Sequence, residues 1–272
     1  MNISFIGGGN MATALIGGMI DKGADTRAFR VVEPFSEQQD KLAERFPGLG
    51  LFGEPTAGAI EGAELVVMAV KPQQMREAAL ALAPFIPDIP VTMSIAAGTR
   101  IVDLARWLGG YARIVRAMPN TPSLIGAGIS GIFAPVGVDA GSRMLAERVL
   151  EAAGAVVWVE REEMLDAVTG VSASGPAYVF YFLEALEQSA REMGFSAADA
   201  RKLTYATFDG AIKLAQASEF EPAILRAQVT SKGGTTERAL ATMEAAGVKA
   251  AIVRAAKAAA ERAREMGEAL GK

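Results

Sequence analysis

The chain has 272 residues and a net charge of −4, with 27 basic and 31 acidic side chains, so it lacks the strongly basic balance typical of nucleic-acid binding. It contains no cysteine and no histidine, which excludes disulfides, thiolate nucleophiles, imidazole metal ligands and Ser-His-Asp catalysis. Apolar residues make up 51% of the chain, as in a globular protein. We therefore expect a globular fold without a metal site or a nucleic-acid partner.

The N-terminal residues Met1 to Ile6 lack the basic region and cleavage site of a secretory signal. The most apolar stretches, residues 65–70 and 129–138, are shorter than the roughly 20 residues that a membrane span requires. We therefore expect a cytoplasmic protein with no membrane partner.

Residues 2 to about 160 alternate short apolar segments with helical ones. This alternation indicates the α/β class, with a doubly wound parallel sheet covered by helices on both faces. The expected strands are residues 3–6, 29–32, 65–70, 91–95, 114–117, 129–133 and 156–159. We place a first domain at residues 1–160.

The remainder, residues 161–272, is rich in Ala and Leu and predicts a second, all-helical domain. Pro176 is suited to the first turn of a helix, and Ser196 can cap the helix that follows it. Apolar residues spread around much of these two helices, so we expect a partner subunit to cover them. The alternative is that they pack only on the sheet domain. The expected helices are residues 176–193, 197–217, a short helix from 222, 236–246 and 248–270.

A glycine-rich loop follows the first expected strand, which ends at Ile6. Its sequence, Gly7-Gly8-Gly9-Asn10-Met11-Ala12, fits the pattern G-x-G-x-x-A and opens a helix. In this pattern Gly7 permits a tight turn, Gly9 lets the backbone approach a pyrophosphate, and Ala12 allows close contact between helix and strand. The loop predicts dinucleotide binding, and the alternative is a structural glycine turn.

The second strand is followed by Glu33, which lies 21 positions after Ala12. An acidic residue there bonds the adenine ribose hydroxyls in many NAD-binding proteins, which favours NADH. No arginine stands beside Glu33, but Ser36 and the neighbouring backbone N–H groups can hold a 2′-phosphate if the carboxylate points away. The choice between NADH and NADPH therefore stays open.

Two other strand ends are expected at the coenzyme site, because ligands of open α/β sheets bind at the carboxyl ends of the strands. They are Ala69-Val70-Lys71-Pro72 and Ala96-Ala97-Gly98. Lys71 places an ammonium near the expected crevice, although it can equally be a surface lysine.

Blocks along almost the whole chain resemble the pyrroline-5-carboxylate reductase family. The departure that we note is Ala173, where the family commonly has glycine. The matching blocks are Phe5-Ile6-Gly7-Gly8-Gly9-Asn10-Met11, Ala69-Val70-Lys71-Pro72-Gln73, Ser94-Ile95-Ala96-Ala97-Gly98, Arg116-Ala117-Met118-Pro119-Asn120-Thr121-Pro122, Ser174-Gly175-Pro176-Ala177-Tyr178 and Val229-Thr230-Ser231-Lys232-Gly233-Gly234-Thr235-Thr236-Glu237-Arg238-Ala239-Leu240.

This resemblance implies an N-terminal Rossmann domain and a helical dimerisation and substrate domain that interlocks with a second subunit, giving a homodimer or a larger assembly. The implied reaction is the reduction of L-1-pyrroline-5-carboxylate to L-proline by NADPH or NADH. The absence of histidine agrees with this reaction, because a protonated cyclic imine is already electrophilic and needs positioning more than a strong protein acid.

By similarity to the family, Ser231, Gly234, Thr235 and Thr236 hold the substrate carboxylate. The Thr236 hydroxyl is then expected near the ring nitrogen as a catalytic group, and Glu219 is a second catalytic candidate. The alternative for the loop is a Gly-Gly turn with a threonine cap, and Glu219 can be a solvated charge at a helix end.

A further coenzyme contact is expected from Met118-Pro119-Asn120, because the prolines around Asn120 force an extended path beside the nicotinamide pocket. Asn120 can contact the carboxamide. A rigid connection between domains fits the same residues.

Two other functions remain open at this point. A reductase of the 3-hydroxyacid dehydrogenase type shares the domain pairing, but Lys202, Lys213 and Lys232 lack the motif around that family's catalytic lysine. A dinucleotide-sensing module would bind the coenzyme without turnover.

Overall fold

The computed structural model describes residues 1–271, which divide into two compact units. One comprises residues 1–174 with the C-terminal segment from Lys257, and the other comprises Gly175–Ala256. The sequence analysis placed the boundary at residue 160, where the composition changes. The compact units, which are defined by contacts, instead meet after Ser174 and again before Lys257. Residues 161–174 and the end of the last helix pack with the sheet.

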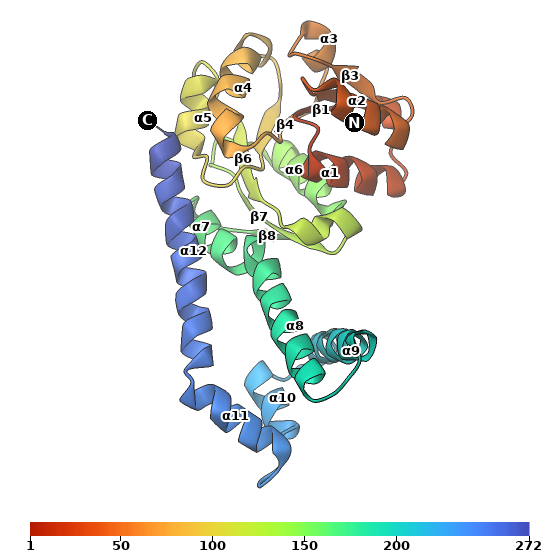
Figure 1. Cartoon of the computed structure of the whole chain (residues 1–272). Helices are drawn as coiled ribbons and strands as arrows, with labels where there is room; N and C mark the ends of the chain where they lie inside the picture. The colour runs from red at the N-terminus through yellow and green to blue at the C-terminus, as the bar shows by residue number, and fades with distance from the viewer. Residues whose placement is uncertain (272) are drawn as a thin grey trace. The chain divides into compact units, whose positions relative to one another are not determined.

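The first unit is built on an eight-stranded sheet with the order β3-β2-β1-β4-β5-β6-β7-β8 (Figure 1). The direction of the order reverses between β1 and β4, which makes this a doubly wound sheet as expected. The strands are β1 (Ile3–Ile6), β2 (Phe29–Val32), β3 (Gly50–Phe52), β4 (Leu65–Met68), β5 (Val91–Ser94), β6 (Ile114–Met118), β7 (Gly128–Phe133) and β8 (Gly154–Trp158).

The sheet differs from the expected parallel sheet at one pairing, because β7 runs antiparallel to β6. The two strands are joined by the short 3-10 turn Thr121–Ile125 and by Gly126, whose φ is +71°. A parallel pair would need a crossover long enough to return to the same end of the sheet. The strand β3 was not expected, because it has only three residues and begins with glycine.

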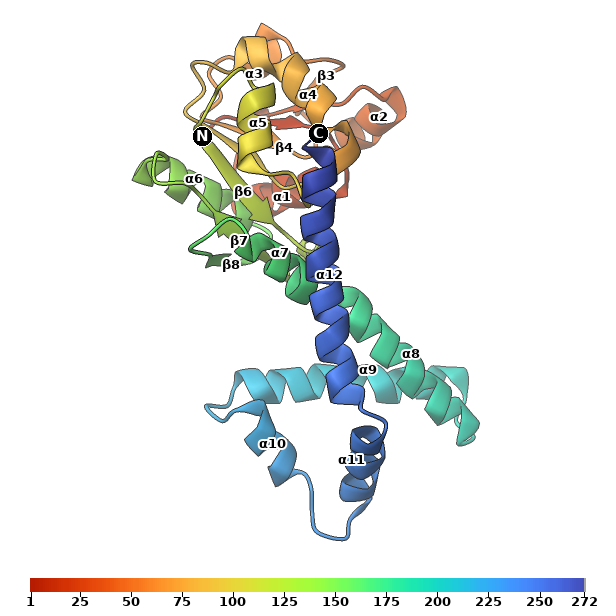
Figure 2. The same cartoon turned by 90° about the vertical axis from the view of Figure 1, so that its left-hand side faces the viewer.

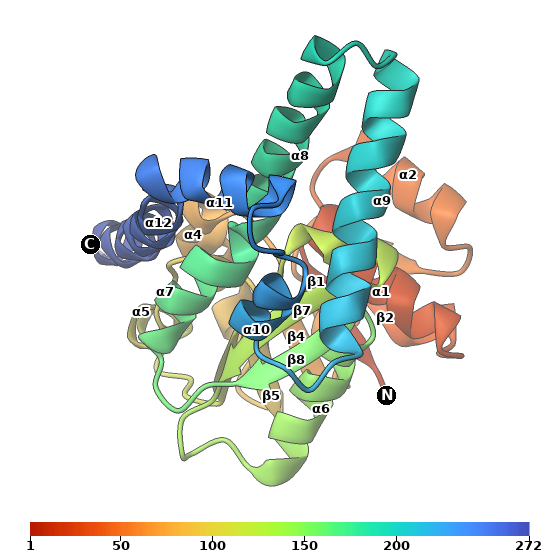
Figure 3. The same ribbon diagram turned by 90° about the horizontal axis from the view of Figure 1, so that it is seen from below.

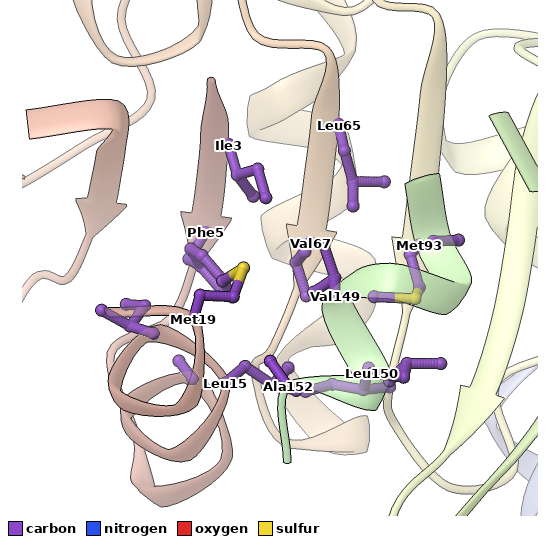
Figure 4. Packing of buried hydrophobic residues seen from close by; sticks show 14 of the residues in the cluster. Ile3, Phe5, Leu15, Met19, Leu65, Val67, Met93, Val149, Leu150 and Ala152 are labelled. Atoms are coloured by element: carbon purple, nitrogen blue, oxygen red, sulfur yellow. The ribbon is translucent and has the colours of Figure 1, made fainter. Parts of the chain in front are cut away.

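Helices cover both faces of this sheet. On one face, α1 (Asn10–Asp21) and α6 (Ala140–Glu151) pack on the strands, and Figure 4 shows Leu15 and Met19 of α1 with Val149 and Leu150 of α6 against strand residues. The opposite face is covered by α3 (Ala57–Ile60), α4 (Met75–Leu82) and α5 (Ile101–Trp107). Each central strand is therefore buried on both sides, which explains its continuous apolar sequence.

Other helical elements of this unit follow the strands and helices above. They include α2 (Ser36–Arg45), α7 (Met164–Val168) and the π-helical turn Thr169–Ala173 that precedes α8. The end of α12 (Val248–Leu270) also belongs here and lies beside α5 in Figures 1 and 2.

The second unit is entirely helical. Its helices α8 (Gly175–Glu192) and α9 (Ala197–Gln216) lie side by side (Figure 3), and the expected cap is confirmed because the Ser196 hydroxyl accepts the Asp199 N–H. After them come α10 (Pro222–Gln228), α11 (Thr235–Ala245) and the first part of α12. Within residues 1–271, no helix is long and apolar enough to cross a membrane.

This helical unit exposes large apolar side chains. Tyr181 is 73% exposed on α8, and Ile212 and Leu214 are each 58% exposed on α9. On α8, α9, α10 and α11 the only buried residues are Ala190, Ala200 and Thr204. A single chain thus leaves much of the apolar surface of these helices in water, as the sequence predicted for a subunit that has a partner.

Candidate active site

The predicted coenzyme segments lie side by side because backbone hydrogen bonds join the carboxyl ends of neighbouring strands. The N–H of Gly7 donates to Val32 O at 2.8 Å, that of Ala69 to Ile6 O at 2.8 Å, and that of Ile95 to Met68 O at 3.2 Å. The ends of β2, β1, β4 and β5 therefore form one continuous edge. This edge includes the topological switch point, where open α/β sheets bind ligands.

The three loop glycines meet different surroundings. A Cβ on Gly7, whose φ is +99°, would lie 2.9 Å from Ala69 O, and one on Gly8 would lie 2.6 Å from Leu42 Cδ1. A Cβ on Gly9 would meet no protein atom within 4 Å. Glycine is thus required at Gly7 by its positive φ and by the nearby backbone, whereas a Cβ on Gly8 would displace the end of the Leu42 side chain. The third glycine faces open space that a pyrophosphate can fill.

The helix that follows the loop is suited to an anion. The cap of α1 is Gly9, which supplies no side-chain hydrogen bond, and the first turn, which contains Asn10 and Met11, carries no acidic residue. Its unpaired backbone N–H groups and the helix dipole therefore favour a phosphate. Ala12 is fully buried in the core, as the close contact between helix and strand requires.

Glu33 is 7% exposed and turns its carboxylate toward the phosphate loop. Its Oε2 accepts the Gly8 N–H at 2.9 Å, and its Oε1 accepts the Phe35 N–H at 3.1 Å. The carboxylate thereby joins the loop after β1 to the loop after β2. A fixed negative charge lies at the place where the adenine ribose is expected.

Gln38, on α2, is a contact of the phosphate loop that the sequence analysis missed. Its Nε2 donates to Gly8 O at 2.6 Å, so α2 supports the phosphate loop from the other side. Ser36 is exposed at the first turn of α2, which also contains Glu37. The position of Gln38 two residues after Ser36 was the available signal, but periodicity alone does not separate it from a solvated helix face.

The loop after β4 is less enclosed. Ala69 and Val70 are half-buried, and Lys71 is exposed and caps the 3-10 turn Pro72–Gln74. After β5, Ala96 is buried and Ala97 is half-buried. All of these residues follow strands on the same edge of the sheet, as predicted.

A partly buried ion pair joins strand β6 to the segment between β8 and α7. Arg116 Nη1 lies 2.6 Å from Glu162 Oε1, and the same oxygen accepts the Ile101 N–H at 2.8 Å. Nearby on α7, burial raises the pKa of Asp166 above its ordinary value, with Arg116 opposing this effect. The sequence analysis assigned no role to Glu162, because its partners are far away in the chain.

Asn120 is buried and bonds two backbone groups. Its Oδ1 accepts the Ile129 N–H at 2.9 Å, and its Nδ2 donates to Ser172 O at 3.1 Å. These contacts tie the β6–β7 loop to β7 and to the π-helical turn within the same compact unit. Met118 and Pro119 immediately precede it and are half-buried and buried.

The loop before α11 also leads into a helix N-terminus, but unlike the first turn of α1, the first turn of α11 contains an acidic residue, Glu237. Gly233 has a φ of +73°, and a Cβ on Gly234 would lie 2.5 Å from Ser231 Oγ. Gly234 caps α11 without a side-chain hydrogen bond, and Glu237 Oε2 accepts the Gly233 N–H at 2.6 Å. The N–H groups of the first turn therefore point out of the helix without intrahelical partners.

The predicted substrate residues are gathered in this loop of the helical unit. Ser231 and Thr235 are exposed, while Thr236 is half-buried. Glu219 is exposed in the segment between α9 and α10.

Two family descriptions match the chain. The family described as Pyrroline-5-carboxylate reductase dimerisation matches residues 162–266, and NADP oxidoreductase coenzyme F420-dependent matches residues 2–98. The first match lies in the helical part, and the second contains the phosphate loop.

Whole proteins of the same kind also match. The chain is 42% identical to a pyrroline-5-carboxylate reductase of Pseudomonas aeruginosa over 99% of this chain and 98% of that one. The structure of a pyrroline-5-carboxylate reductase from Coxiella burnetii superimposes with a TM-score of 0.90 at 37% identity, covering 97% and 98% of the two chains. The Plasmodium falciparum pyrroline carboxylate reductase with NADP bound has the same fold, with a TM-score of 0.87, 24% identity and 98% of each chain covered. The chain therefore belongs to the pyrroline-5-carboxylate reductase family.

Proposed function

We propose that this protein reduces L-1-pyrroline-5-carboxylate to L-proline with NADH or NADPH, the last step of proline biosynthesis. The observation that carries the proposal is the 42% identity over nearly the whole chain to a relative of that name. The glycine-rich edge of the sheet and the loop before α11 supply the two kinds of binding surface that this reaction needs. The chain has no histidine or cysteine to serve another common hydrolytic or thiol mechanism.

The coenzyme fits the edge formed by β2, β1, β4, β5 and β6. Gly9 leaves space for its pyrophosphate, and the start of α1 provides backbone donors. When bound there, NAD(P)H supplies the hydride. We assign its binding to Ile6, Gly7, Gly8, Gly9, Asn10, Met11, Ala12, Glu33, Ser36, Ala69, Val70, Lys71, Pro72, Ala96, Ala97, Met118, Pro119 and Asn120.

The charges beside the adenosine position favour NADH over NADPH. Glu33 is buried and held by two backbone donors, so it cannot turn away without losing both hydrogen bonds. A 2′-phosphate would bring a second negative charge close to it. Ser36 offers a hydroxyl at the start of α2, but Glu37 follows it in the same turn.

Ser231, Gly234, Thr235 and Thr236 are proposed to hold the substrate carboxylate. Support comes from the open N–H groups at the start of α11 and from hydroxyl side chains in the same loop. Because these donors are neutral, they can bind the carboxylate without placing a cationic side chain beside the positively charged imine nitrogen.

The Thr236 hydroxyl is the proposed polar contact at the ring nitrogen. As an acceptor it stabilises the N–H of the protonated imine, and as a donor it bonds the nitrogen lone pair that forms when the C=N bond is reduced. Water can deliver the proton that the product amine finally gains. Glu219 remains a candidate for placing that water, since its carboxylate is exposed in the same unit.

The exposed apolar helices support a homodimer or a larger assembly, in agreement with the dimerisation family that matches residues 162–266. We also propose the cytoplasm as its compartment, because a reductase that consumes NAD(P)H must act where the coenzyme is regenerated.

The direct test is oxidation of NADH and of NADPH by the purified protein, with and without pyrroline-5-carboxylate, and identification of proline as product. We expect turnover that depends on this imine. Binding of the coenzyme without turnover would indicate a sensing module, and turnover of 3-hydroxyacids instead would indicate the related dehydrogenase type.

A further inference from the structure

The end of α12 lies against the loop that follows β5. The loop residues Ala96, Gly98 and Thr99 are buried, and the segment of α12 from Lys257 belongs to the same compact unit as the sheet. In Figures 1 and 2 the last turns of α12 lie beside α5, which begins directly after this loop. The loop is therefore supported on one side by a segment that is distant in sequence.

The contact is made between backbones. A Cβ on Gly267 would lie 2.7 Å from Gly98 O, which is closer than van der Waals contact allows. A Cβ on Gly98 would in turn lie 3.2 Å from Gly267 N and 3.3 Å from Ala263 O. Any side chain at position 267 would therefore collide with Gly98 O. This contact explains why a glycine stands within the helix, where it otherwise lowers helix stability.

Polar contacts fix the same arrangement at the end of α12. Arg106 Nη2 donates to Gly271 O at 2.5 Å, and Arg106 and Arg100 both pair with the buried carboxylate of Asp103 on α5. Arg106 also places a positive charge at the carboxyl end of α12, which the helix dipole favours. Glu162 holds the Ile101 N–H from another side.

We propose that the small residues Ala263 and Gly267 of α12 position the Ala96–Gly98 loop for coenzyme binding, with Gly271 directly after the helix held by Arg106. The inference rests on the proposed binding of NAD(P)H along this edge of the sheet. Because α12 starts in the helical unit, the chain segment that follows the substrate loop also sets the shape of the coenzyme site. These residues act through the loop and do not need to touch the coenzyme.

The test is the substitution Gly267→Ala, which adds one methyl group against Gly98 O. The methyl must push the loop and the helix apart by several tenths of an ångström, and displacements of this size commonly cost about tenfold in ligand affinity or rate. We expect the Kd for NADH, measured by fluorescence titration without substrate, to rise by about tenfold. The KM for pyrroline-5-carboxylate should stay within about twofold, since the α11 loop is unchanged.

Ala269→Ser is the matched control. Ala269 is an exposed residue of α12 two positions after Gly267, so its substitution should leave the Kd unchanged. If Gly267→Ala does not fold, Ala263→Gly removes a buried methyl from the same face and should raise the Kd in the same direction. If the variant that folds has a lower Tm but an unchanged Kd for NADH, the contact contributes only to stability, and the proposal is wrong. The proposed function would be refuted instead, with this inference intact, if Gly267→Ala raised the Kd for NADH as expected but the wild-type protein did not turn over pyrroline-5-carboxylate.

Discussion

The sheet unit and the helical unit bury their apolar residues to very different degrees. In the sheet unit, two large apolar clusters fill both faces of the sheet, and the phosphate loop is held by Glu33 and Gln38 of the same chain. In the helical unit, side chains such as Tyr181 and Ile212 are exposed, and so are Ser231 and Thr235 around the start of α11. The residues that we propose for the coenzyme thus lie in a unit with its own core, whereas those proposed for the substrate lie in a unit whose apolar helices are exposed in the single chain.

The strongest test of this difference is a charge placed on the exposed helices. Tyr181→Asp and Ile212→Asp each put a carboxylate on a surface that we expect to be covered by a partner, and losing such an anchor commonly costs a factor of about 100 or more in association. We expect sedimentation to show dissociation and assays to show loss of turnover. NADH binding should persist, because the sheet unit has its own core.

Val136→Asp is the matched control, since Val136 is 99% exposed in the sheet unit and should leave both assembly and turnover intact. If Tyr181→Asp and Ile212→Asp both remain assembled and active, the apolar surface is not an interface.

The next largest effect is expected at Thr236. Removing one preorganised polar contact at a reacting centre costs about tenfold to a thousandfold, so Thr236→Ala should lower kcat/KM for pyrroline-5-carboxylate by such a factor. Thr236→Ser should recover much of the loss. Steady-state kinetics would contradict the assignment if the alanine variant kept full efficiency or lost NADH affinity instead.

A substitution at Gly9 tests the coenzyme half of the proposed site. A Cβ at this position meets no protein atom within 4 Å, so Gly9→Ala should leave the Tm nearly unchanged while its methyl occupies space expected for the pyrophosphate. We expect the Kd for NADH to rise by about tenfold to a hundredfold. Gly7→Ala is the contrasting variant, because its Cβ clashes with Ala69 O and should lower the Tm.

A smaller effect is expected at Glu33. Glu33→Gln removes the charge but keeps an oxygen that can accept one of the two backbone hydrogen bonds. The ratio of kcat/KM for NADPH to that for NADH should rise by about tenfold, since repulsion of the 2′-phosphate is lost. Glu44→Gln, on the exposed face of α2, should leave the ratio unchanged. An equal loss of both coenzymes would mean that Glu33 only braces the loop.

Local patterns predicted the features that depend on neighbouring residues. Strands such as β1 and β2 have an apolar sequence and sharp ends, and Gly7 and Ser196 occupy positions that their residue types favour. Contacts between distant residues were not predictable in this way. The antiparallel β7, the inward turn of Glu33 and the approach of Gly267 to Gly98 each depend on which segments meet in space.

The candidate site follows the same rule. The glycine-rich loop could be predicted because the conformation and close contacts of its backbone require particular residue types. The α11 loop was predicted only from the resemblance to a family. Asn120 shows the difference, because its sequence context fitted both a coenzyme contact and a structural connection. In the structure both ends of its amide bond the backbone.

The most direct test of the two-part site is a steady-state experiment in which NADH and pyrroline-5-carboxylate are both varied for Gly9→Ala and Thr236→Ala. We expect Gly9→Ala to raise the KM for NADH with little change in that for pyrroline-5-carboxylate. Thr236→Ala should lower kcat/KM for pyrroline-5-carboxylate with little change in NADH affinity. If both variants altered the same parameter to a similar extent, the assignment of coenzyme and substrate to separate loops would be wrong.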